Sequence, residues 1–530
     1  MSLTVQNLTY IHPNKDLLFR NISFSVSAGE KCAIIGNNGV GKSTLLKILA
    51  GKLQPVTGYI LSDGPVYMVP QHFGQFDDMS VAEVLGLTDK LKALSAIYDG
   101  RGTERDYELL NDEWDISERL AAAFAKWQIS HITPNMRMGN LSGGEKTKVF
   151  LAKLELYKPS VVLMDEPTNH LDTKGRSLLY EYIAYSSRPT IIVSHDRTLL
   201  NMLSGIYEMS LAGMRFYPMN YDAYRETVDA ETYAKVTQLE NRQKELAKAE
   251  KSARKTIERQ QKHASRGKKQ SEKKCVARIS MGVLSDKSET TTSRLNKVQQ
   301  EKMEVMRQEI NELRSSINEY TGIKINIGNS IFTDRKLLIE ARDVAFGYLG
   351  QKTMWSQHPL NFSIFSGERI CLQGDNGCGK STLLKLMIGT LQPTSGEMFR
   401  NEAINILYLD QEYSCIDNDL TVYGQLEACT KRPEHELKML LNRFLFTSST
   451  WDKKCGCLSG GEKMKLALCR LVVCEKAPDM IIADEPTNNV DIASMDILAT
   501  VLKNYKGTLL VVSHDKQFIH DIGIERVIGL

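Results

Sequence analysis

The sequence VVLMDEPTNHLD, residues 161–172, places four apolar residues before two adjacent carboxylates and ends on a further aspartate. A near copy, MIIADEPTNNVD, occupies residues 480–491 of the 530-residue chain. A short apolar run that ends in acids is typical of a buried parallel strand. Because ligands bind at the carboxyl edge of such sheets, the repeat predicts an α/β fold with one acidic ligand site in each half of the chain.

A glycine-rich loop lies upstream of each acidic stretch. The sequences GNNGVGKST and GDNGCGKST both fit G-x-x-x-x-G-K-[ST], and each stands between an apolar strand and an apolar helical run. This context predicts a loop that holds phosphates, so loop and acids together indicate a nucleotide triphosphatase. The predicted phosphate-binding residues are Gly36, Asn37, Asn38, Gly39, Val40, Gly41, Lys42, Ser43, Thr44, Gly374, Asp375, Asn376, Gly377, Cys378, Gly379, Lys380, Ser381 and Thr382.

Length and composition limit the class of protein. A chain of 530 residues exceeds one hydrophobic core, and the repeat sets the number of nucleotide-binding domains at two. The net charge of +3 is small, so any attraction to nucleic acid must come from a local patch. No apolar run reaches the roughly 18 residues of a membrane span, and no secretory signal pattern opens the chain. The ten scattered cysteines, without zinc-site spacing around Cys455 and Cys457, favour a reduced, cytosolic protein.

Three polar or aromatic positions recur at equivalent places in the two halves. Gln71 and Gln411 each end a predicted strand, where an amide can lie beside Mg²⁺ or the attacking water. His195 and His514 each end a later strand, and their repetition after the acids predicts contact with the γ-phosphate. Tyr10 and Tyr348 precede the glycine loops; each is interpreted either as a stacking platform for a base or as a core residue.

A further repeated sequence, LSGGE, leads into a predicted helix in each half, at 148–156 and 465–473. Serine followed by two glycines at a helix start exposes backbone N–H groups to an anion. Because each half already has a phosphate loop, we expect this second cradle to close over the nucleotide of the opposite half. Its residues are Ser142, Gly143, Gly144, Glu145, Ser459, Gly460, Gly461 and Glu462.

Five motifs occur twice in the same order: the glycine loop, the strand-end glutamine, LSGGE, the acidic stretch and the strand-end histidine. This combination resembles the ATP-binding cassette ATPases. The sequence NHLD at 169–172, Glu145 and Glu462 after the double glycine, and two cassettes in one chain resemble the ABC-F subfamily more specifically. Val490, where leucine is usual, and Cys378 inside the second glycine loop are departures from the pattern.

The resemblance implies two tandem cassettes, residues 1–224 and 331–530, joined by a long antiparallel helical hairpin at 225–330. It implies that the cassettes close head to tail over two ATP molecules. In each closed site, the lysine and serine of one cassette face the LSGG sequence of the other cassette. The implied pairings are Lys42 and Ser43 with residues 459–461, and Lys380 and Ser381 with residues 142–144.

The resemblance also assigns a role to each side chain of the two sites. The lysines offset β/γ-phosphate charge, the glutamates polarise the attacking water and the histidines hold the γ-phosphate. The predicted catalytic residues are Glu166, Glu485, His195 and His514. The predicted Mg²⁺ ligands are Ser43, Gln71, Asp165, Ser381, Gln411 and Asp484.

The connector differs from both cassettes in composition. Glycine, proline and apolar strands almost vanish, and heptad-like spacing predicts two long antiparallel helices. The segment that joins them is basic, with Arg254, Lys255, Arg259, Lys262, Arg266, Lys268, Lys269, Lys273, Lys274 and Arg278. Positive charge concentrated near a hairpin tip predicts contact with a phosphate backbone; a solvated spacer is the alternative interpretation.

In the ABC-F family the connector reaches into the ribosome from the tRNA exit site toward the peptidyl-transferase region. By resemblance, the linker at 254–293, above all 266–293, is predicted to contact tRNA and ribosomal RNA. The predicted protein is a cytoplasmic monomer that hydrolyses ATP and acts in translation or protects the ribosome from antibiotics. Two alternatives stay open, a double ATPase subunit of a membrane transporter and a slow ATP-gated binding module.

Overall fold

The computed structural model divides the chain into two compact units, one formed by residues 1–222 with 323–530 and the other by residues 223–322. The first unit contains both cassettes. The described residues are 2–13, 15–210, 213–273, 297–298, 300–314, 335–348, 353–375, 377–410, 412–474, 477–488 and 490–530. Asn376, Gln411 and the joining segment at 274–293 therefore lie outside the description.

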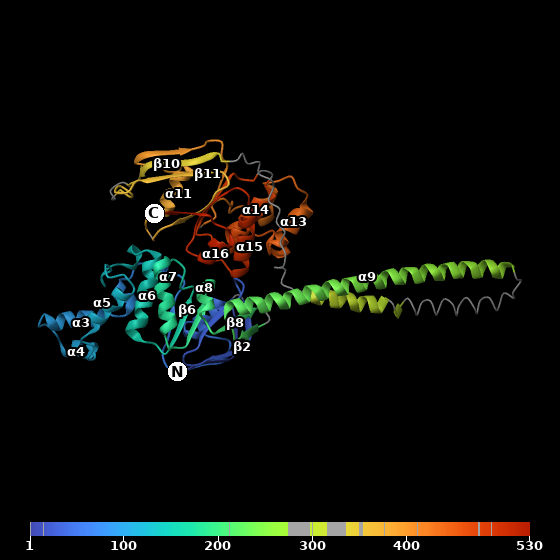
Figure 1. Cartoon of the computed structure of the whole chain (residues 1–530). Coiled ribbons are helices and arrows are strands. Elements are labelled where there is room, and N and C mark those ends of the chain that lie inside the picture. Colours follow the sequence, from blue (N-terminus) through green and yellow to red (C-terminus); the bar gives the residue numbers. More distant parts are fainter. Residues whose placement is uncertain are drawn as a thin grey trace. The chain divides into compact units, whose positions relative to one another are not determined.

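The first cassette contains a six-stranded sheet in the order β5-β6-β7-β3-β8-β9, and helices α6, α7 and α8 belong to the same cassette (Figure 1). Only β9 runs antiparallel to its neighbour. The strands are β3 (Lys31–Ile35), β5 (Val66–Val69), β6 (Val161–Asp165), β7 (Thr190–Val193), β8 (Gly205–Ser210) and β9 (Gly213–Tyr217). A separate antiparallel sheet has the order β2-β1-β4, from β1 (Leu3–Ile11), β2 (Leu17–Val26) and β4 (Thr57–Ser62).

The second cassette repeats this plan with five parallel strands in the order β14-β15-β16-β12-β17. They are β12 (Arg369–Gln373), β14 (Ile406–Leu409), β15 (Met480–Asp484), β16 (Thr508–Val512) and β17 (Arg526–Gly529). The antiparallel sheet β11-β10-β13 is formed by β10 (Leu337–Ala345), β11 (Leu360–Phe365) and β13 (Ser395–Arg400). The predicted α/β fold with two repeated cassettes is confirmed.

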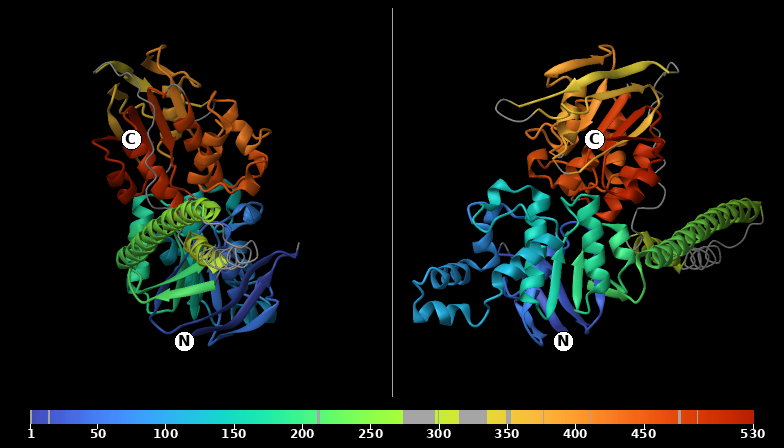
Figure 2. Two further views of the ribbon diagram at one scale, coloured as in Figure 1. Left: turned by 90° about the vertical axis from the view of Figure 1, so that its right-hand side faces the viewer. Right: turned by 60° about the vertical axis from the view of Figure 1, so that its left-hand side comes forward.

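Helices surround the parallel sheets and form an insertion in the first cassette. Helices α3 (Thr88–Tyr98) and α4 (Glu104–Leu110) lie side by side and project from that cassette (Figure 2). The remaining helices of the first cassette are α1 (Lys42–Leu49), α2 (Val81–Leu85), α5 (Ile116–Lys126), α6 (Gly143–Tyr157), α7 (Thr173–Tyr185) and α8 (Arg197–Asn201). Those of the second are α11 (Lys380–Ile388), α12 (Val422–Glu427), α13 (Glu434–Arg443), α14 (Gly460–Val473), α15 (Ile492–Asn504) and α16 (Lys516–Asp521).

The strands that carry the acids are buried along their whole length. Every residue of β6 and of β15 is buried, as expected for central parallel strands covered on both faces. Burying about 100 Å² of each such side chain contributes on the order of 2 kcal/mol. The core therefore fixes where the strands end, and it delivers the acids to the carboxyl edge of each sheet.

The second unit is helical in its described part. Helix α9 (Tyr221–Lys273) enters it, and residues 300–314 are helical as well. Arg242 pairs with Glu309 at 3.5 Å, and Glu250 pairs with Arg307 at 2.8 Å. Because the partner number falls as the α9 number rises, the two helical segments run in opposite directions. The predicted antiparallel helices are confirmed for these residues.

Candidate functional site

The first phosphate loop has a backbone that only glycine adopts easily. Gly41, the N-cap of α1, has a φ of 104°. A Cβ atom at Gly36 would lie 2.3 Å from the carbonyl oxygen of Met209, so a side chain cannot fit there. The loop thus turns tightly between β3 and α1, as a phosphate-binding loop at a helix N-terminus requires.

The consecutive lysine and serine of the loop make different contacts. Lys42 is buried, and its Nζ donates to the carbonyl oxygens of Gly36 at 2.6 Å and Asn37 at 3.1 Å. The Ser43 hydroxyl donates to Asp165 Oδ1 at 3.2 Å. Lys42 therefore lies against the carbonyl groups of the phosphate loop, while Ser43 is hydrogen-bonded to the aspartate at the end of β6.

The second phosphate loop repeats these contacts. Lys380 Nζ donates to the carbonyl oxygens of Gly374 at 2.8 Å and Asp375 at 3.2 Å. The Ser381 hydroxyl donates to Asp484 Oδ2 at 3.0 Å. The predicted phosphate and acidic residues of each cassette thus come together, apart from Asn376, which lies outside the described residues.

The glutamates after the strand-end aspartates have a strained backbone. Glu166 has a φ of 49° and Glu485 a φ of 50°, in the left-handed region that side chains other than glycine rarely adopt. The Glu166 N–H donates to the carbonyl of Val193 at 2.8 Å, and the Glu485 N–H donates to that of Val512 at 2.9 Å. These bonds tie each glutamate to the neighbouring strand end. Such strain is common at functional sites.

Each glutamate faces the histidine that follows that neighbouring strand. His195 Nε2 lies 3.3 Å from Glu166 Oε1, and His514 Nε2 lies 3.4 Å from Glu485 Oε1. Burial raises the pKa of Glu166 and lowers that of His195. Burial also raises the pKa of Glu485 to about 7 and lowers that of His514 to about 4. Neutral histidine beside a proton-accepting carboxylate suits acid–base work on water and phosphate.

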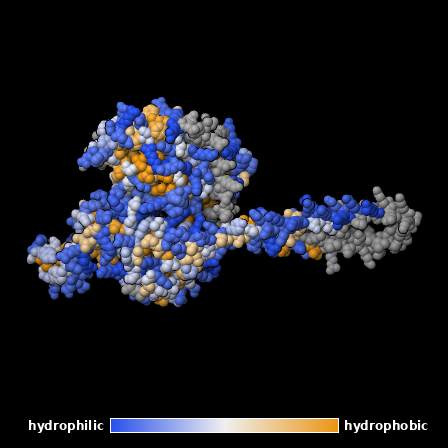
Figure 3. Space-filling view, viewed as in Figure 1, coloured by the Kyte–Doolittle hydropathy of each residue, from blue (hydrophilic) through white to orange (hydrophobic). Residues whose placement is uncertain are grey.

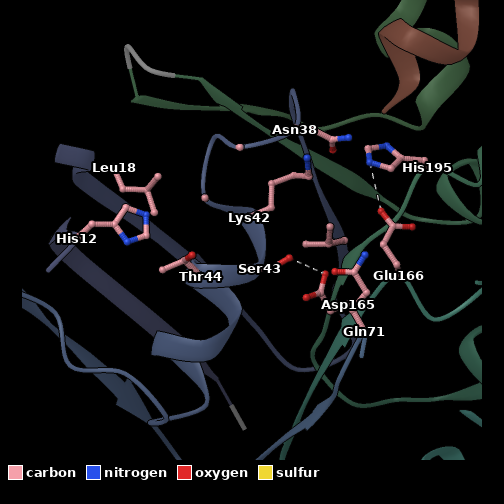
Figure 4. A pocket seen from close by; sticks show the side chains of 13 residues that line it. His12, Leu18, Asn38, Lys42, Ser43, Thr44, Gln71, Asp165, Glu166 and His195 are labelled. Carbon is pink, nitrogen blue, oxygen red and sulfur yellow. Dashed lines mark hydrogen bonds and ion pairs between the residues drawn. The ribbon is translucent and has the colours of Figure 1, made fainter. Parts of the chain in front are cut away.

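These side chains line a pocket of about 280 Å³ in the first cassette (Figure 4). His12 and Leu18 lie at one side of it, Glu166 and His195 at the other, and Lys42 between them. The described lining residues are His12, Leu18, Asn38, Gly39, Gly41, Lys42, Ser43, Thr44, Gln71, Asp165, Glu166, Val193 and His195. All belong to the first cassette, and residues 459–461 are not among them. The implied pairing of those residues with Lys42 stays a prediction.

Sequence reasoning missed His12 and Leu18. Tyr10 instead packs against His12 and Phe19, with ring centroids 5.6 Å and 6.1 Å away, and is partly buried on the core. His12 lies two residues beyond Tyr10, just after β1 ends at Ile11, and lines the pocket. The base-stacking role of Tyr10 stays a prediction, and His12 is a second candidate for it.

A second cavity, of about 260 Å³, draws residues from both cassettes. Ser142, Gly143 and Gly144 line it together with Glu485 and His514. Gly377 of the second phosphate loop also lines it, so the structure brings the first LSGG sequence to the second site, as the resemblance implies. Tyr348 is not among the residues that line this cavity; its hydroxyl lies 3.2 Å from Thr382 Oγ1, and its base-stacking role stays a prediction.

The LSGGE sequences form the same cap in both cassettes. Helix α6 starts at Gly143, earlier than the predicted Lys148, with Ser142 as its N-cap. The Ser142 hydroxyl accepts from the Glu145 N–H at 3.3 Å, and the Glu145 carboxylate accepts from the Ser142 N–H at 2.8 Å. Ser459 and Glu462 repeat this reciprocal arrangement at α14. The predicted cradle glutamates therefore hold the turn in shape.

The acidic edge offers the ligands that Mg²⁺ prefers. Asp165 and Ser43 supply oxygens within 3.2 Å of each other, and the Gln71 amide lines the same pocket. Asp484 and Ser381 repeat the pair, whereas Gln411 lies outside the described residues. An oxygen donor set with a phosphate cradle beside it fits Mg²⁺ bound with a triphosphate. Among the described residues, no group of three or more His, Cys, Asp or Glu could hold a metal ion without other ligands.

Comparison with known proteins identifies the class. The family model described as ABC transporter matches residues 19–169 and 357–488. The ATP-binding protein YdiF of Bacillus subtilis (strain 168) is 32% identical over 536 residues, which cover 96% of this chain and 77% of the relative. ABC transporter F family member 5 of Arabidopsis thaliana is 30% identical over a match that covers 96% of this chain and 72% of the relative.

Among solved structures, this chain is similar to one in the complex of archaeal ribosomal stalk protein aP1 and archaeal ribosome recycling factor aABCE1. The TM-score is 0.59 at 18% identity, and the match covers 99% of this chain and 87% of the other. The structure of an RNase-L Inhibitor matches with the same TM-score and coverage. At this identity the likeness shows a common fold.

Fold and site together define an ATPase of the ATP-binding cassette type, with a phosphate loop and an acidic strand end in each of two cassettes. Within that class, the chain belongs to the ABC-F subfamily. The described residues include no helix both long and apolar enough to cross a membrane.

Proposed function

We propose that this ATPase binds the ribosome and couples ATP-driven closure of its cassettes to the position of the helical connector, which contacts tRNA or ribosomal RNA. A cytoplasmic location and a monomeric state belong to the same proposal. Whether the bound protein acts as a translation factor or protects the ribosome from antibiotics depends on the connector.

The observation that carries the proposal is the charge on the connector. Between residues 251 and 266, helix α9 has six basic residues and one acid. Arg254, Lys255, Arg259, Lys262 and Arg266 are all exposed. Hydrophilic side chains cover most of the described outer part of α9 (Figure 3). A row of exposed cations is the footprint expected for a phosphate backbone.

Likeness to proteins that act on ribosomes supports the same partner. One similar chain is an archaeal ribosome recycling factor bound to a ribosomal stalk protein. Another belongs to a model of ribosome-bound archaeal Pelota and ABCE1. These partners are those of the similar proteins. They suggest the ribosome as the partner to test first for this chain.

The proposed chemistry uses groups already in place in each cassette. Lys42 and Lys380 turn from the loop carbonyls to the β- and γ-phosphates, since an ammonium prefers a charged oxygen. Glu166 and Glu485 accept a proton from the attacking water, and His195 and His514 orient the γ-phosphate. Mg²⁺, held by the serine–aspartate pairs, supplies charge neutralisation of the phosphates.

Co-sedimentation with ribosomes tests this proposal. A variant with both Glu166→Gln and Glu485→Gln keeps the shape of the sites but loses the basic carboxylates, so the closed ATP state should accumulate. With ATP it should pellet with ribosomes through a cushion at low salt and less at high salt, as phosphate contacts require. Recovery in the supernatant under all conditions would contradict a ribosomal partner. Recovery with membranes would instead favour a transporter subunit.

A matched pair of charge variants tests the connector. Arg254→Glu, Lys255→Glu and Arg259→Glu together should weaken ribosome binding about tenfold or more and leave ATP binding unchanged. The control changes three exposed lysines of the second cassette, Lys503, Lys506 and Lys516, to Glu. Equal binding by the two triple variants would show that the connector is a spacer. The predicted lysines at 268–274 extend the same test.

A further inference from the structure

The first turns of α7 and α15 occupy equivalent places but differ in chemistry. Thr173 and Ile492 each stand seven residues after the glutamate of their own cassette. Arg176 and Met495 each stand ten residues after it. The first cassette therefore has a hydroxyl and a guanidinium where the second has two apolar side chains.

Thr173 contacts the histidine of the opposite cassette. Its Oγ1 lies 3.4 Å from His514 Nδ1, across 341 residues of sequence. On its other side, His514 Nε2 lies 3.3 Å from Lys380 Nζ and 3.4 Å from Glu485 Oε1. A hydroxyl can donate to Nδ1 or accept from it, so Thr173 can hold the ring in either tautomer.

The first site lacks this support. His195 Nδ1 is buried and, among the residues that the structure describes, has no hydrogen-bond partner. Ile492, the residue equivalent to Thr173, has no polar side-chain atom that could provide one. A buried ring nitrogen without a partner is less stable than one that is hydrogen-bonded. The two catalytic histidines are thus held unequally.

Arg176 adds a second difference at the same place. It is buried, donates through Nε to the carbonyl oxygen of Leu171 at 3.3 Å and pairs with Asp196 Oδ2 at 3.4 Å. Arg176 also lines the cavity that contains Glu485 and His514, and a smaller cavity that contains Glu166, His195 and Met495. A fixed positive charge beside a phosphate site attracts the negative charge that forms on phosphate oxygens during hydrolysis. Met495, at the equivalent place, carries no charge.

We infer that Thr173 is a positioning residue of the second ATP site, supplied by the first cassette, that the first site has no equivalent of it, and that Arg176 adds a positive charge beside both sites. Hydrolysis at the second site then requires contact between the cassettes through the start of α7. The first site hydrolyses more slowly because its histidine is not held. This inference rests on the proposed roles of the two glutamates and not on the ribosomal partner.

Single-turnover ADP formation, with enzyme in excess over ATP, measures each site separately. A Glu166→Gln variant reports hydrolysis at the second site, and a Glu485→Gln variant reports the first. In the Glu166→Gln background, Thr173→Val should lower the rate of ADP formation about tenfold, because valine keeps the shape of threonine and removes its hydroxyl. In the Glu485→Gln background, Thr173→Val should change the rate by less than about twofold. Thr173→Ser keeps the hydroxyl and should stay within about twofold in both.

Arg176→Met tests the charge in the same two backgrounds, with thermal unfolding as a check of the fold. It should lower the rate in both, because Arg176 lines a cavity at each site. Three results with the Thr173 variants would overturn the inference. They are an unchanged rate with Thr173→Val at the second site, an equal loss of rate with Thr173→Val at both sites, or an equal loss of rate with Thr173→Val and Thr173→Ser. The double glutamate variant should form no ADP. ADP formation by that variant would instead overturn the assignment of the glutamates.

Discussion

The two ATP sites share their motifs and differ in their surroundings. The first pocket is lined by residues of the first cassette alone, from His12 to His195. The second cavity combines the first LSGG sequence with Glu485 and His514. Second-cassette contact at the first site includes a bond from the Asn38 N–H to Asp491 Oδ2, at 3.1 Å. Identical catalytic motifs therefore do not make identical sites, because side chains outside the motifs decide which groups are held.

The largest expected effect concerns the glutamates. Replacing Glu166 and Glu485 together by Gln should lower steady-state ATP turnover about 10²- to 10⁴-fold, since each site loses its general base. ATP binding should remain. Of the single variants, Glu485→Gln should be the more damaging, because it disables the better supported site. Phosphate release assays decide this, and a larger loss with Glu166→Gln would reverse the proposed order of the two sites.

The phosphate-loop lysines should separate the sites by binding. Lys42→Ala should weaken ATP at the first site about 100-fold, because a charged hydrogen bond to phosphate is lost. Lys380→Ala should do the same at the second. Equilibrium dialysis should then find one nucleotide per chain for each variant and two for the unmodified protein. Two bound nucleotides in the Lys42 variant would contradict the role assigned to that lysine.

A smaller effect is expected on the base side of the first pocket. In the Lys380→Ala background, where only the first site binds, His12→Ala should weaken ATP about threefold, in line with the loss of one ring contact. Tyr10→Phe, which keeps the packed ring, should leave the affinity unchanged. Fluorescence titration measures both. The reverse pattern would return the stacking role to Tyr10.

The smallest effect concerns a contact between the cassettes. Arg197 pairs with Asp496 at 2.5 Å and with Asp521 at 2.9 Å, while its equivalent Lys516 has no ion pair within the described residues. Because these pairs are partly exposed, Arg197→Ala should cost about 1 kcal/mol and lower Tm by about 2 °C. Lys516→Ala should not change Tm. Equal shifts for the two variants would remove this difference between the cassettes.

Much of the fold was predictable from the sequence because its signals are local. The apolar runs that end in Asp165 and Asp484 mark the central strands, and the glycine loops mark the turns before α1 and α11. Both features were predicted correctly, since burial and turn geometry depend on neighbouring residues. The pairing of each serine with its aspartate follows from the sheet order.

The remaining features depend on contacts between distant segments. Neither Thr173 nor Arg176 belongs to a motif, and their meaning appears only where they meet residues more than 300 positions away. A position-by-position comparison of the two repeats would have marked them as unlike Ile492 and Met495. The left-handed backbone of Glu166 gave no local signal either, because the surrounding strands impose it.

The separation of 341 residues between Thr173 and His514 also has a consequence for synthesis of the chain. Domains fold largely as units, N-terminal first, as the chain is made. All lining residues of the first pocket and every strand of its sheet are present once residue 217 has emerged, so a nascent chain can bind its first nucleotide while the connector is still being translated. The second site exists only after His514 is made. Hydrolysis there therefore marks a chain whose two cassettes have both been translated.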